Sequence, residues 1–134
     1  MLSTSIENYL RSEKNFLGCF PCNKLPPIPQ QFPKSLIINT DEFSKPGDHW
    51  LGLVLTKKKC YYFDSFGLPV LNKNILEYLR NYYNKVIYSD MCIQHVLSKK
   101  CGEFCITFVK NVKCKKSYTE FICQFDFLNL MNNQ

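Results

Sequence analysis

Blocks of apolar residues alternate with polar segments along the chain, and each block predicts one element of structure. Mostly apolar runs at 36–39, 50–55 and 60–63 have the length and composition of buried strands. Three consecutive lysines separate the last two runs, which therefore predict a β-hairpin with a polar tip. A fourth strand is predicted at 85–88, and the segment 44–47 (SKPG) is typical of a turn.

Helical spacing of apolar residues predicts four helices, at 4–13, 72–83, 101–112 and 118–131. The apolar face of the third predicted helix consists of Phe104, Cys105, Phe108, Val109 and Val112. Five prolines between 21 and 33 predict an extended, non-helical connection. The order of these elements predicts an α+β fold, with a central mixed or antiparallel sheet and helices on both sides.

The size and composition of the chain predict one globular domain spanning residues 1–134. Hydrophobic residues make up 46% and aromatic residues 15%, which excludes an intrinsically disordered chain. The formal net charge of +6 favours binding to DNA or another polyanion. Two lysine runs, Lys57-Lys58-Lys59 and Lys99-Lys100, are candidate DNA-binding residues; the alternative is that they are solvated lysines of turns and helix ends.

Eight cysteines raise the question of disulfides and metal binding. The N-terminal segment is polar, without the apolar stretch of a secretory signal, so we expect an intracellular, reducing setting in which cysteines remain thiols. Cys60, Cys105 and Cys123 have apolar neighbours and are predicted as small core residues. Cys19 and Cys22 form a CxxC without a second pair, so we expect structural thiols and no metal site, with zinc and redox roles as alternatives. No apolar run reaches the ~20 residues of a membrane span.

Cys101 is the candidate nucleophile because it opens the helix predicted at 101–112. A helix N-terminus stabilises negative charge and lowers the pKa of a thiol from its usual value of about 8.5. Gly102 would let a substrate backbone approach closely. Cys105 lies one turn further along, on the apolar face, and is expected to be buried and unreactive. The alternative for Cys101 is a structural role.

His49 and Asp64 are brought together by the predicted hairpin. His49 stands just before the first strand and Asp64 just after the second, so antiparallel pairing places them side by side. An aspartate beside an imidazole fixes the tautomer and stabilises the imidazolium form. Gln94 lies seven residues before Cys101, and its amide can donate to an oxyanion. Taken singly, the three residues have ordinary alternatives: a surface histidine, a turn-capping carboxylate and a polar loop residue.

Taken together, these residues resemble the adenovirus protease family. The resemblance is carried by residues 16–18 (FLG), 37–40 (IINT), 47–50 (GDHW), 60–67 (CYYFDSFG) and 101–105 (CGEFC). It implies His49 as general base, Asp64 as the acidic residue that orients it, Gln94 as oxyanion donor and Cys101 as nucleophile. Asp64 stands where adenoviruses carry a glutamate.

The resemblance implies a cysteine endopeptidase that cleaves viral precursor proteins of the capsid or core at glycine-containing sites during particle maturation. We expect Trp50, Gly102 and Gly47 to line the substrate cleft, with a core role as the alternative for Trp50. The resemblance implies that the enzyme needs no cofactor. It implies DNA and a short viral peptide as partners that stimulate the enzyme. The implied location is the host cell interior (nucleus or virus factory) and the virion.

Two segments are shorter than in adenoviruses: the one between Asp64 and Gln94, and the chain after Cys101. Both contribute to contacts with the peptide activator in the adenovirus enzyme, so that partner does not carry over by resemblance alone. The shortening suggests a more distant virus or a virus-like mobile element as the source.

Three other functions stay open from the sequence. A protease that removes ubiquitin-like modifiers from host proteins would use the same residues, because that wider group shares the histidine–tryptophan site and a glutamine ahead of the cysteine. An acyltransferase could use the same nucleophile. A non-catalytic DNA-binding or capsid-associated relative would keep the fold and bind DNA through its lysines.

Overall fold

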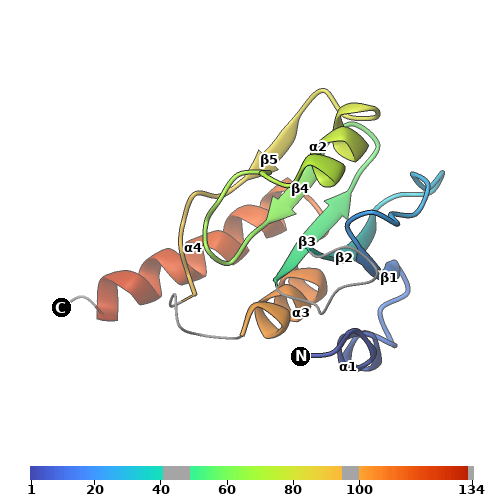
Figure 1. Ribbon diagram of the computed structural model, residues 1–134. Coiled ribbons are helices and arrows are strands. Elements are labelled where there is room, and N and C mark those ends of the chain that lie inside the picture. The colour runs from blue at the N-terminus through green and yellow to red at the C-terminus, as the bar shows by residue number, and fades with distance from the viewer. Residues whose placement is uncertain (41–48, 95–99, 133–134) are drawn as a thin grey trace.

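A computed structural model describes residues 1–40, 49–94 and 100–132 (Figure 1). The elements in chain order are α1 (Ser3–Tyr9), β1 (Phe16–Pro21), β2 (Lys34–Asn39), β3 (Trp50–Leu55), β4 (Cys60–Phe63), α2 (Lys73–Arg80), β5 (Val86–Tyr88), α3 (Cys101–Asn111) and α4 (Lys115–Asn132). The turn predicted at 44–47 lies outside the described residues.

The strands form one sheet in the order β1-β2-β3-β4-β5. The central pairs, β2 with β3 and β3 with β4, are antiparallel, whereas β1 and β5 pair in parallel with their neighbours. All six residues of β3 are buried, as expected for a central strand covered on both faces. The mixed sheet predicted from the sequence is thereby confirmed.

Helices cover both faces of this sheet, as predicted. Side chains alternate between the faces along each strand, so neighbouring residues enter different cores. One core packs against α1, α3 and α4 and receives Ile37, Trp50, Val54, Tyr61 and Phe63 from the sheet. The other packs against α2 and receives Leu36, Ile38, Leu51, Leu53, Leu55, Cys60 and Tyr62.

Helix α3 lies directly on β3, and this close contact positions the candidate nucleophile. A Cβ atom built at Gly52 would lie 2.5 Å from the Phe108 ring, so only glycine lets the helix approach the strand this closely. Near the start of β3, a Cβ built at Gly102 would lie 3.4 Å from the Trp50 ring. The helix therefore runs alongside the strand and brings its first residue, Cys101, to the end of the sheet where β3 begins.

Several features differ from the sequence predictions. Helices α1 and α2 end at Tyr9 and Arg80, before the predicted ends at 13 and 83. Strand β1 was not predicted, because it contains Gly18 at φ +132° and ends at Pro21, both uncommon inside strands. Helix α4 begins three residues earlier than predicted, where the Ser117 hydroxyl accepts hydrogen bonds from two backbone N–H groups. Cys123 is exposed, so its predicted core position is wrong, whereas Cys60 and Cys105 are buried.

Within the described residues, none of the helices combines the length and the apolar character required to span a bilayer.

Candidate active site

The β3–β4 hairpin brings His49 and Asp64 into contact. His49 precedes Trp50 at the start of β3, and Asp64 follows Phe63 at the end of the antiparallel β4. The His49 Nε2 atom lies 2.9 Å from Asp64 Oδ1, and the two side chains are 16% and 6% exposed. The same carboxylate oxygen accepts a 2.8 Å hydrogen bond from the Phe66 backbone N–H. The pairing that the hairpin predicted is therefore present, in a largely water-excluded setting.

Cys101, the first residue of helix α3, is the third member of this arrangement. It is 7% exposed at the first position of α3, and its thiol is hydrogen-bonded to the His49 side chain and to the backbone N–H groups of Trp50 and Gly102. Because Nε2 of His49 pairs with Asp64, the other ring nitrogen, Nδ1, is the atom that forms the hydrogen bond with the thiol. Cysteine, histidine and aspartate thus form one chain of hydrogen bonds.

The electrostatics of this chain favour charge separation. Burial alone would raise the pKa of the Cys101 thiol, but hydrogen bonds from His49 and the Trp50 backbone outweigh it and lower that pKa. Burial alone would lower the pKa of His49, but its hydrogen bonds to Asp64 and Cys101 outweigh this and raise it to about 9. Both shifts favour a thiolate beside an imidazolium, which is the reactive form of a nucleophilic cysteine.

Cys105 provides an internal contrast one turn further along α3. It is completely buried, and burial, reinforced by the negative charges of Cys101 and Asp64, raises the pKa of its thiol well above the usual value. It is the unreactive core cysteine that the sequence predicted.

Gln94 is held in place by hydrogen bonds to Ser65, the residue that follows Asp64. The Ser65 hydroxyl donates to Gln94 Oε1, and both residues are buried. The Ser65 carbonyl also accepts from the backbone N–H groups of Ile93 and Gln94, at 2.9 and 3.0 Å. Because Oε1 accepts from Ser65, the donor group Nε2 forms the opposite branch of the amide, as an oxyanion donor requires. Ser65 was missed by the sequence analysis; its only signal is a polar residue directly after Asp64.

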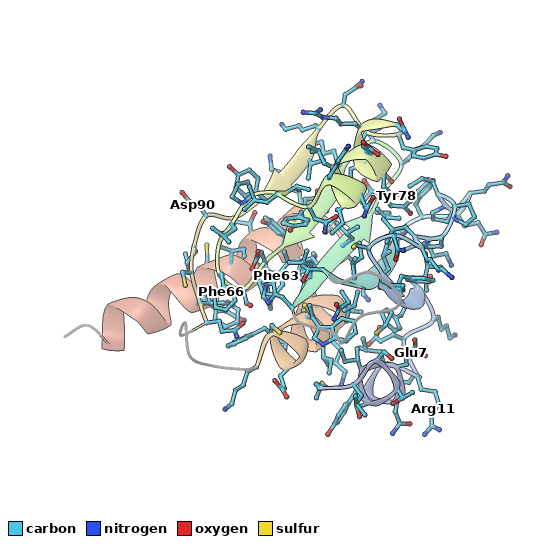
Figure 2. All side chains as sticks on the ribbon, viewed as in Figure 1. Glu7, Arg11, Phe63, Phe66, Tyr78 and Asp90 are labelled. Atoms are coloured by element: carbon cyan, nitrogen blue, oxygen red, sulfur yellow. The ribbon has the colours of Figure 1, made fainter. Side chains whose placement is uncertain are left out.

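Phe66 is a second residue that the sequence analysis missed. Its ring stacks on the His49 imidazole, with centroids 4.8 Å apart and planes 26° from parallel. Figure 2 shows it on the loop that follows β4. The loop closes with a Gly67 N–H to Asp64 carbonyl bond of 2.8 Å, and Gly67 has φ +73°, which favours glycine. The aromatic face attracts an imidazolium cation and limits rotation of the ring.

The predicted substrate-binding residues have mixed outcomes. Trp50 is 8% exposed and belongs to the core, and its indole N–H donates to the Met1 carbonyl at 3.1 Å. Gly102 is buried, and the space where a Cβ would lie is bordered by Met1 Sδ at 3.1 Å. Gly47 lies outside the described residues.

A family model described as adenovirus endoprotease matches residues 16–132. The chain belongs to the adenovirus endoprotease family. The match includes His49, Asp64, Gln94 and Cys101, and it confirms the family that the short motifs resembled. The search of curated proteins gives no match.

Membership in the adenovirus endoprotease family makes the chain a viral cysteine peptidase by family, with protein substrates. The described part of this endoprotease has no group of three or more His, Cys, Asp or Glu side chains that could hold a metal ion. Of the CxxC cysteines, Cys22 is buried and its thiol donates to the Thr40 carbonyl at 3.2 Å, while Cys19 is half-buried. Both are free thiols.

The candidate DNA-binding lysines of this endoprotease form two separate groups. Lys57, Lys58 and Lys59 form the turn after β3, whereas Lys100 directly precedes Cys101 at the other end of that strand. Six residues of strand span roughly 17 Å, which separates the two groups. Lys99 lies outside the described residues. The described lysines of the two runs therefore lie at opposite ends of β3.

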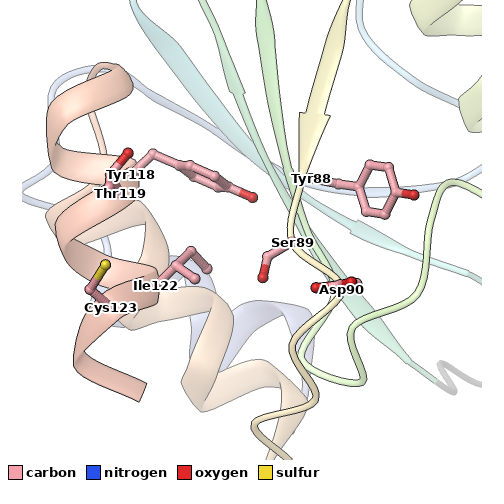
Figure 3. Close-up of a pocket in the computed structure, with 7 residues that line it drawn as sticks. All are labelled: Tyr88, Ser89, Asp90, Tyr118, Thr119, Ile122 and Cys123. Atoms are coloured by element: carbon pink, nitrogen blue, oxygen red, sulfur yellow. The ribbon is translucent and has the colours of Figure 1, made fainter. Parts of the chain in front are cut away.

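A cavity of about 520 Å³ opens beside β5, one of the two outer strands of the sheet (Figure 3). It lies between the end of β5 and the first half of α4, and its lining residues are Tyr88, Ser89, Asp90, Tyr118, Thr119, Ile122 and Cys123. The Tyr118 ring reaches from α4 toward Ser89 in Figure 3. Tyr118 is 6% exposed, and within the described residues its hydroxyl has no hydrogen-bond partner.

Proposed function

We propose that this protein is a cysteine endopeptidase of a virus or virus-like mobile element, and that it cleaves capsid or core precursor proteins at glycine-containing sites during particle maturation. The observation that carries the proposal is the buried hydrogen-bonded chain of Cys101, His49 and Asp64 in a member of the adenovirus endoprotease family. In this proposal the enzyme acts in the nucleus or virus factory of the host cell and in the virion.

The first half of the reaction forms an acyl-enzyme. His49 Nδ1 holds the proton of Cys101, and the thiolate attacks the scissile carbonyl carbon. Negative charge then develops on the carbonyl oxygen, where the Gln94 amide and the Cys101 backbone N–H donate hydrogen bonds. The carbon–nitrogen bond breaks as His49 delivers its proton to the leaving amine, which leaves a thioester on Cys101.

The second half releases the new carboxyl end. His49, now neutral, accepts a proton from water, and the resulting hydroxide attacks the thioester carbonyl. The thiolate leaves and regains its imidazolium partner. Asp64 stays ionised throughout: it keeps the ring oriented and stabilises its positive charge, as in other triads.

The proposal is tested with a panel of capsid and core precursor peptides that differ only in glycine content around the scissile bond. We expect cleavage at the glycine-containing members by the wild type and none by Cys101→Ala. Cleavage of ubiquitin-like fusions in preference to these peptides would instead indicate a protease for host modifiers. Transfer of an acetyl group from acetyl-CoA without peptide cleavage would indicate an acyltransferase.

DNA is the first proposed stimulating partner, and the basic end of the sheet supports it. Exposed and half-buried lysines gather where β3 ends and β4 begins, and the Lys85 carbonyl accepts from the Cys60 backbone N–H there. The Tyr118 ring in the first turn of α4 lies 5.1 Å from the Tyr61 ring of β4, so the basic start of α4 adds to the same end. The lysines concerned are Lys57, Lys58, Lys59, Lys85, Lys115 and Lys116. Such clusters bind phosphates without sequence preference.

A peptide is the second proposed stimulating partner, and the cavity beside β5 is where we would place it. β5 is the outer strand of the sheet, so an extended peptide could pair with its second edge. The unpartnered Tyr118 hydroxyl could donate to a peptide carbonyl, which would remove the cost of an unsatisfied buried group.

The segment beside that cavity is connected to the active site, which gives a bound peptide a route to influence catalysis. A Cβ built at Gly67 would lie 2.6 Å from the Asp90 carbonyl oxygen, so the two segments are in direct contact. Four residues beyond Asp90, the Gln94 backbone N–H donates to Ser65. Peptide bound beside Asp90 would therefore stabilise two adjoining segments, the one after β4 that carries Asp64 and the one after β5 that carries Gln94. Faster cleavage on adding a candidate peptide, lost in Tyr118→Phe, is the expected result.

A further inference from the structure

Ser65 joins two segments that come from different parts of the chain. Its hydroxyl donates to Gln94 Oε1, and its carbonyl oxygen accepts from the backbone N–H groups of Ile93 and Gln94 at 2.9 and 3.0 Å. Ser65 is completely buried, and Gln94 is 3% exposed. A second contact lies nearby, because a Cβ atom built at Gly67 would be 2.6 Å from the Asp90 carbonyl oxygen. The segment after β4 and the segment after β5 are therefore packed together, and Ser65 links them by hydrogen bonds.

The two chain neighbours of Ser65 both contact the catalytic histidine. Asp64 Oδ1 lies 2.9 Å from His49 Nε2, and the Phe66 backbone N–H donates to the same carboxylate oxygen at 2.8 Å. The Phe66 ring stacks on the His49 imidazole. The three residues from Asp64 to Phe66 therefore hold His49 through the outer two and Gln94 through the central one.

The hydrogen bond from the Ser65 hydroxyl decides the orientation of an amide with two different branches. Oε1 only accepts hydrogen bonds and Nε2 only donates them, and a rotation of 180° about the last side-chain bond exchanges the two. Within residues 1–40, 49–94 and 100–132, Gln94 Oε1 is the one hydrogen-bond partner of the Ser65 hydroxyl. After such a rotation the hydroxyl could accept from Nε2, but its own hydrogen would be buried without a partner, which is unfavourable. The observed orientation keeps that hydrogen paired.

We propose that Ser65 is a positioning residue for the oxyanion site, because its hydroxyl keeps the Nε2 branch of the Gln94 amide available to the substrate carbonyl oxygen as negative charge develops there. The inference rests on the proposed function, in which Gln94 is one of the two oxyanion donors. A rotated amide would present Oε1 instead, and its partial negative charge would repel the oxyanion. Ser65 therefore acts on acyl transfer through Gln94.

Two small reagents separate this role from general support of the active site. p-Nitrophenyl acetate acylates a thiolate by addition to a carbonyl group, so an oxyanion forms during the reaction. Iodoacetamide alkylates the same thiolate by displacement of iodide from a saturated carbon, so no oxyanion forms. Release of p-nitrophenol and mass spectrometry give the two rates for Cys101, with Cys101→Ala as the background for the other thiols. Neither reagent depends on the identity of the natural substrate.

Ser65→Ala is the first variant to measure. Removal of the hydroxyl should slow acylation of Cys101 about 3- to 10-fold, the factor that one hydrogen bond of ordinary strength provides, and should change alkylation less than about twofold. Gln94→Met keeps the length of the side chain but removes the amide, and it should slow acylation roughly 10-fold or more. Because Ser65 acts through Gln94, the double variant should be no slower than Gln94→Met alone.

Ser35→Ala is the matched control. Ser35 is another buried serine, 3% exposed, and its hydroxyl has no hydrogen-bond partner in the part of the chain that the structure describes. Its replacement should leave both rates unchanged. Ser65→Thr keeps the hydroxyl and should restore the wild-type rate of acylation. If Ser65→Ala does not fold, Ser65→Cys takes its place, because a thiol is close in size and a weaker donor, and acylation should again slow while alkylation does not.

Two results would overturn the positioning role. Equal slowing of acylation and alkylation in Ser65→Ala would show that Ser65 only supports the segment that carries Asp64. Unchanged acylation would show that the Gln94 amide needs no help from the hydroxyl. Failure of the proposed function would look different: the wild type would cut none of the precursor peptides, while the rates with the two reagents would still follow the expected pattern. A wild-type Cys101 that is not acylated at all would reject both.

Discussion

The two ends of the central sheet use charge in opposite ways. Where β3 begins and β4 ends, one histidine and one aspartate are largely buried, and each charge has named partners at hydrogen-bond distance. Where β3 ends and β4 begins, lysines project into solvent from a turn, and their effect is a diffuse positive potential. The comparison teaches that the first end depends on geometry and tolerates almost no change, whereas the second depends on the number of charges and should tolerate single substitutions.

Removal of the nucleophile should have the largest effect of any single change. Without the Cys101 thiol no acyl-enzyme can form, so Cys101→Ala should reduce kcat by roughly 10⁴- to 10⁶-fold, the range seen when a catalytic nucleophile is lost. Cys114→Ala, which removes an exposed thiol whose printed hydrogen bonds are with Ser117, is the control and should keep full activity. Peptide assays measure the activity of both variants. Undiminished cleavage by Cys101→Ala would show that another residue is the nucleophile.

Replacement of the buried carboxylate should come next. Asp64→Asn keeps the shape but removes the charge that stabilises the His49 imidazolium, so kcat should fall roughly 10²- to 10⁴-fold and the pKa of His49 should drop. The histidine pKa can be followed by NMR of the imidazole protons. Asp90→Asn is the control, since this exposed aspartate lies outside the hydrogen-bonded chain, and it should leave both quantities unchanged.

The pH profile should separate the roles of Cys101 and His49. The pKa of the thiol is lowered, so the alkylation rate of Cys101 should level off at a lower pH than that of an ordinary thiol. The pKa of His49 is raised to about 9, so cleavage should decline as pH rises through 9, when the proton for the leaving amine is lost. Because this pKa is above the ordinary value, protonated His49 stabilises the fold fully at low pH, and that contribution is lost as pH rises through about 9. Alkylation that continues to rise to pH 9 would show an ordinary thiol.

A backbone change at the catalytic end should mainly affect stability. Gly67→Ala would place a methyl group 2.6 Å from the Asp90 carbonyl at φ +73°, and we expect a loss of about 1–3 kcal/mol in the free energy of unfolding. Gly18→Ala is also strained, at φ +132°, but its nearest neighbours lie 3.6 Å away, so it adds no backbone clash. Urea denaturation measures both losses, and unchanged stability in Gly67→Ala would contradict the contact with Asp90.

Changes at the lysine end should have the smallest effect on catalysis. The triple change of Lys57, Lys58 and Lys59 to Gln should reduce the slope of log Kd against log salt by about two to three for duplex DNA. The triple variant should cleave peptides in the absence of DNA at a rate within twofold of wild type. Lys100→Gln is the comparison at the other end. A larger loss of DNA binding in Lys100→Gln than in the triple variant would place the DNA near the active site instead.

The sequence predicted the parts of the fold that depend on local patterns. The hairpin of β3 and β4 followed from two apolar runs around a lysine tip, and it placed His49 and Asp64 together. Strand β1 was missed for two reasons. A proline-rich connection separates it from its partner β2, and β1 itself contains Gly18 and Pro21, which are uncommon in strands. Cys123 was assigned to the core from apolar neighbours, but the helix turns it outward.

The residues that support the active site could not be predicted, for a related reason. Ser65 and Phe66 act through the direction of their side chains, toward Gln94 and His49, and no spacing rule encodes that direction. Met1 reaches Trp50 and Gly102 only because α1 packs beside α3, which is a long-range contact. Sequence patterns identified which residue types the chemistry needs, whereas packing decided which neighbours orient them.

The most direct test of the account is the reaction of the folded protein with iodoacetamide from pH 5 to 9, read by mass spectrometry in wild type, Cys101→Ala and His49→Ala. The exposed Cys114 is the main competitor, because hydrogen bonds from Ser117 lower the pKa of its thiol too, so Cys114→Ala serves as the background. The account predicts that Cys101, although only 7% exposed, reacts first, with an apparent pKa below 8.5, and that His49→Ala slows it. Modification of Cys101 no faster than that of the exposed Cys92 and Cys123 would contradict it.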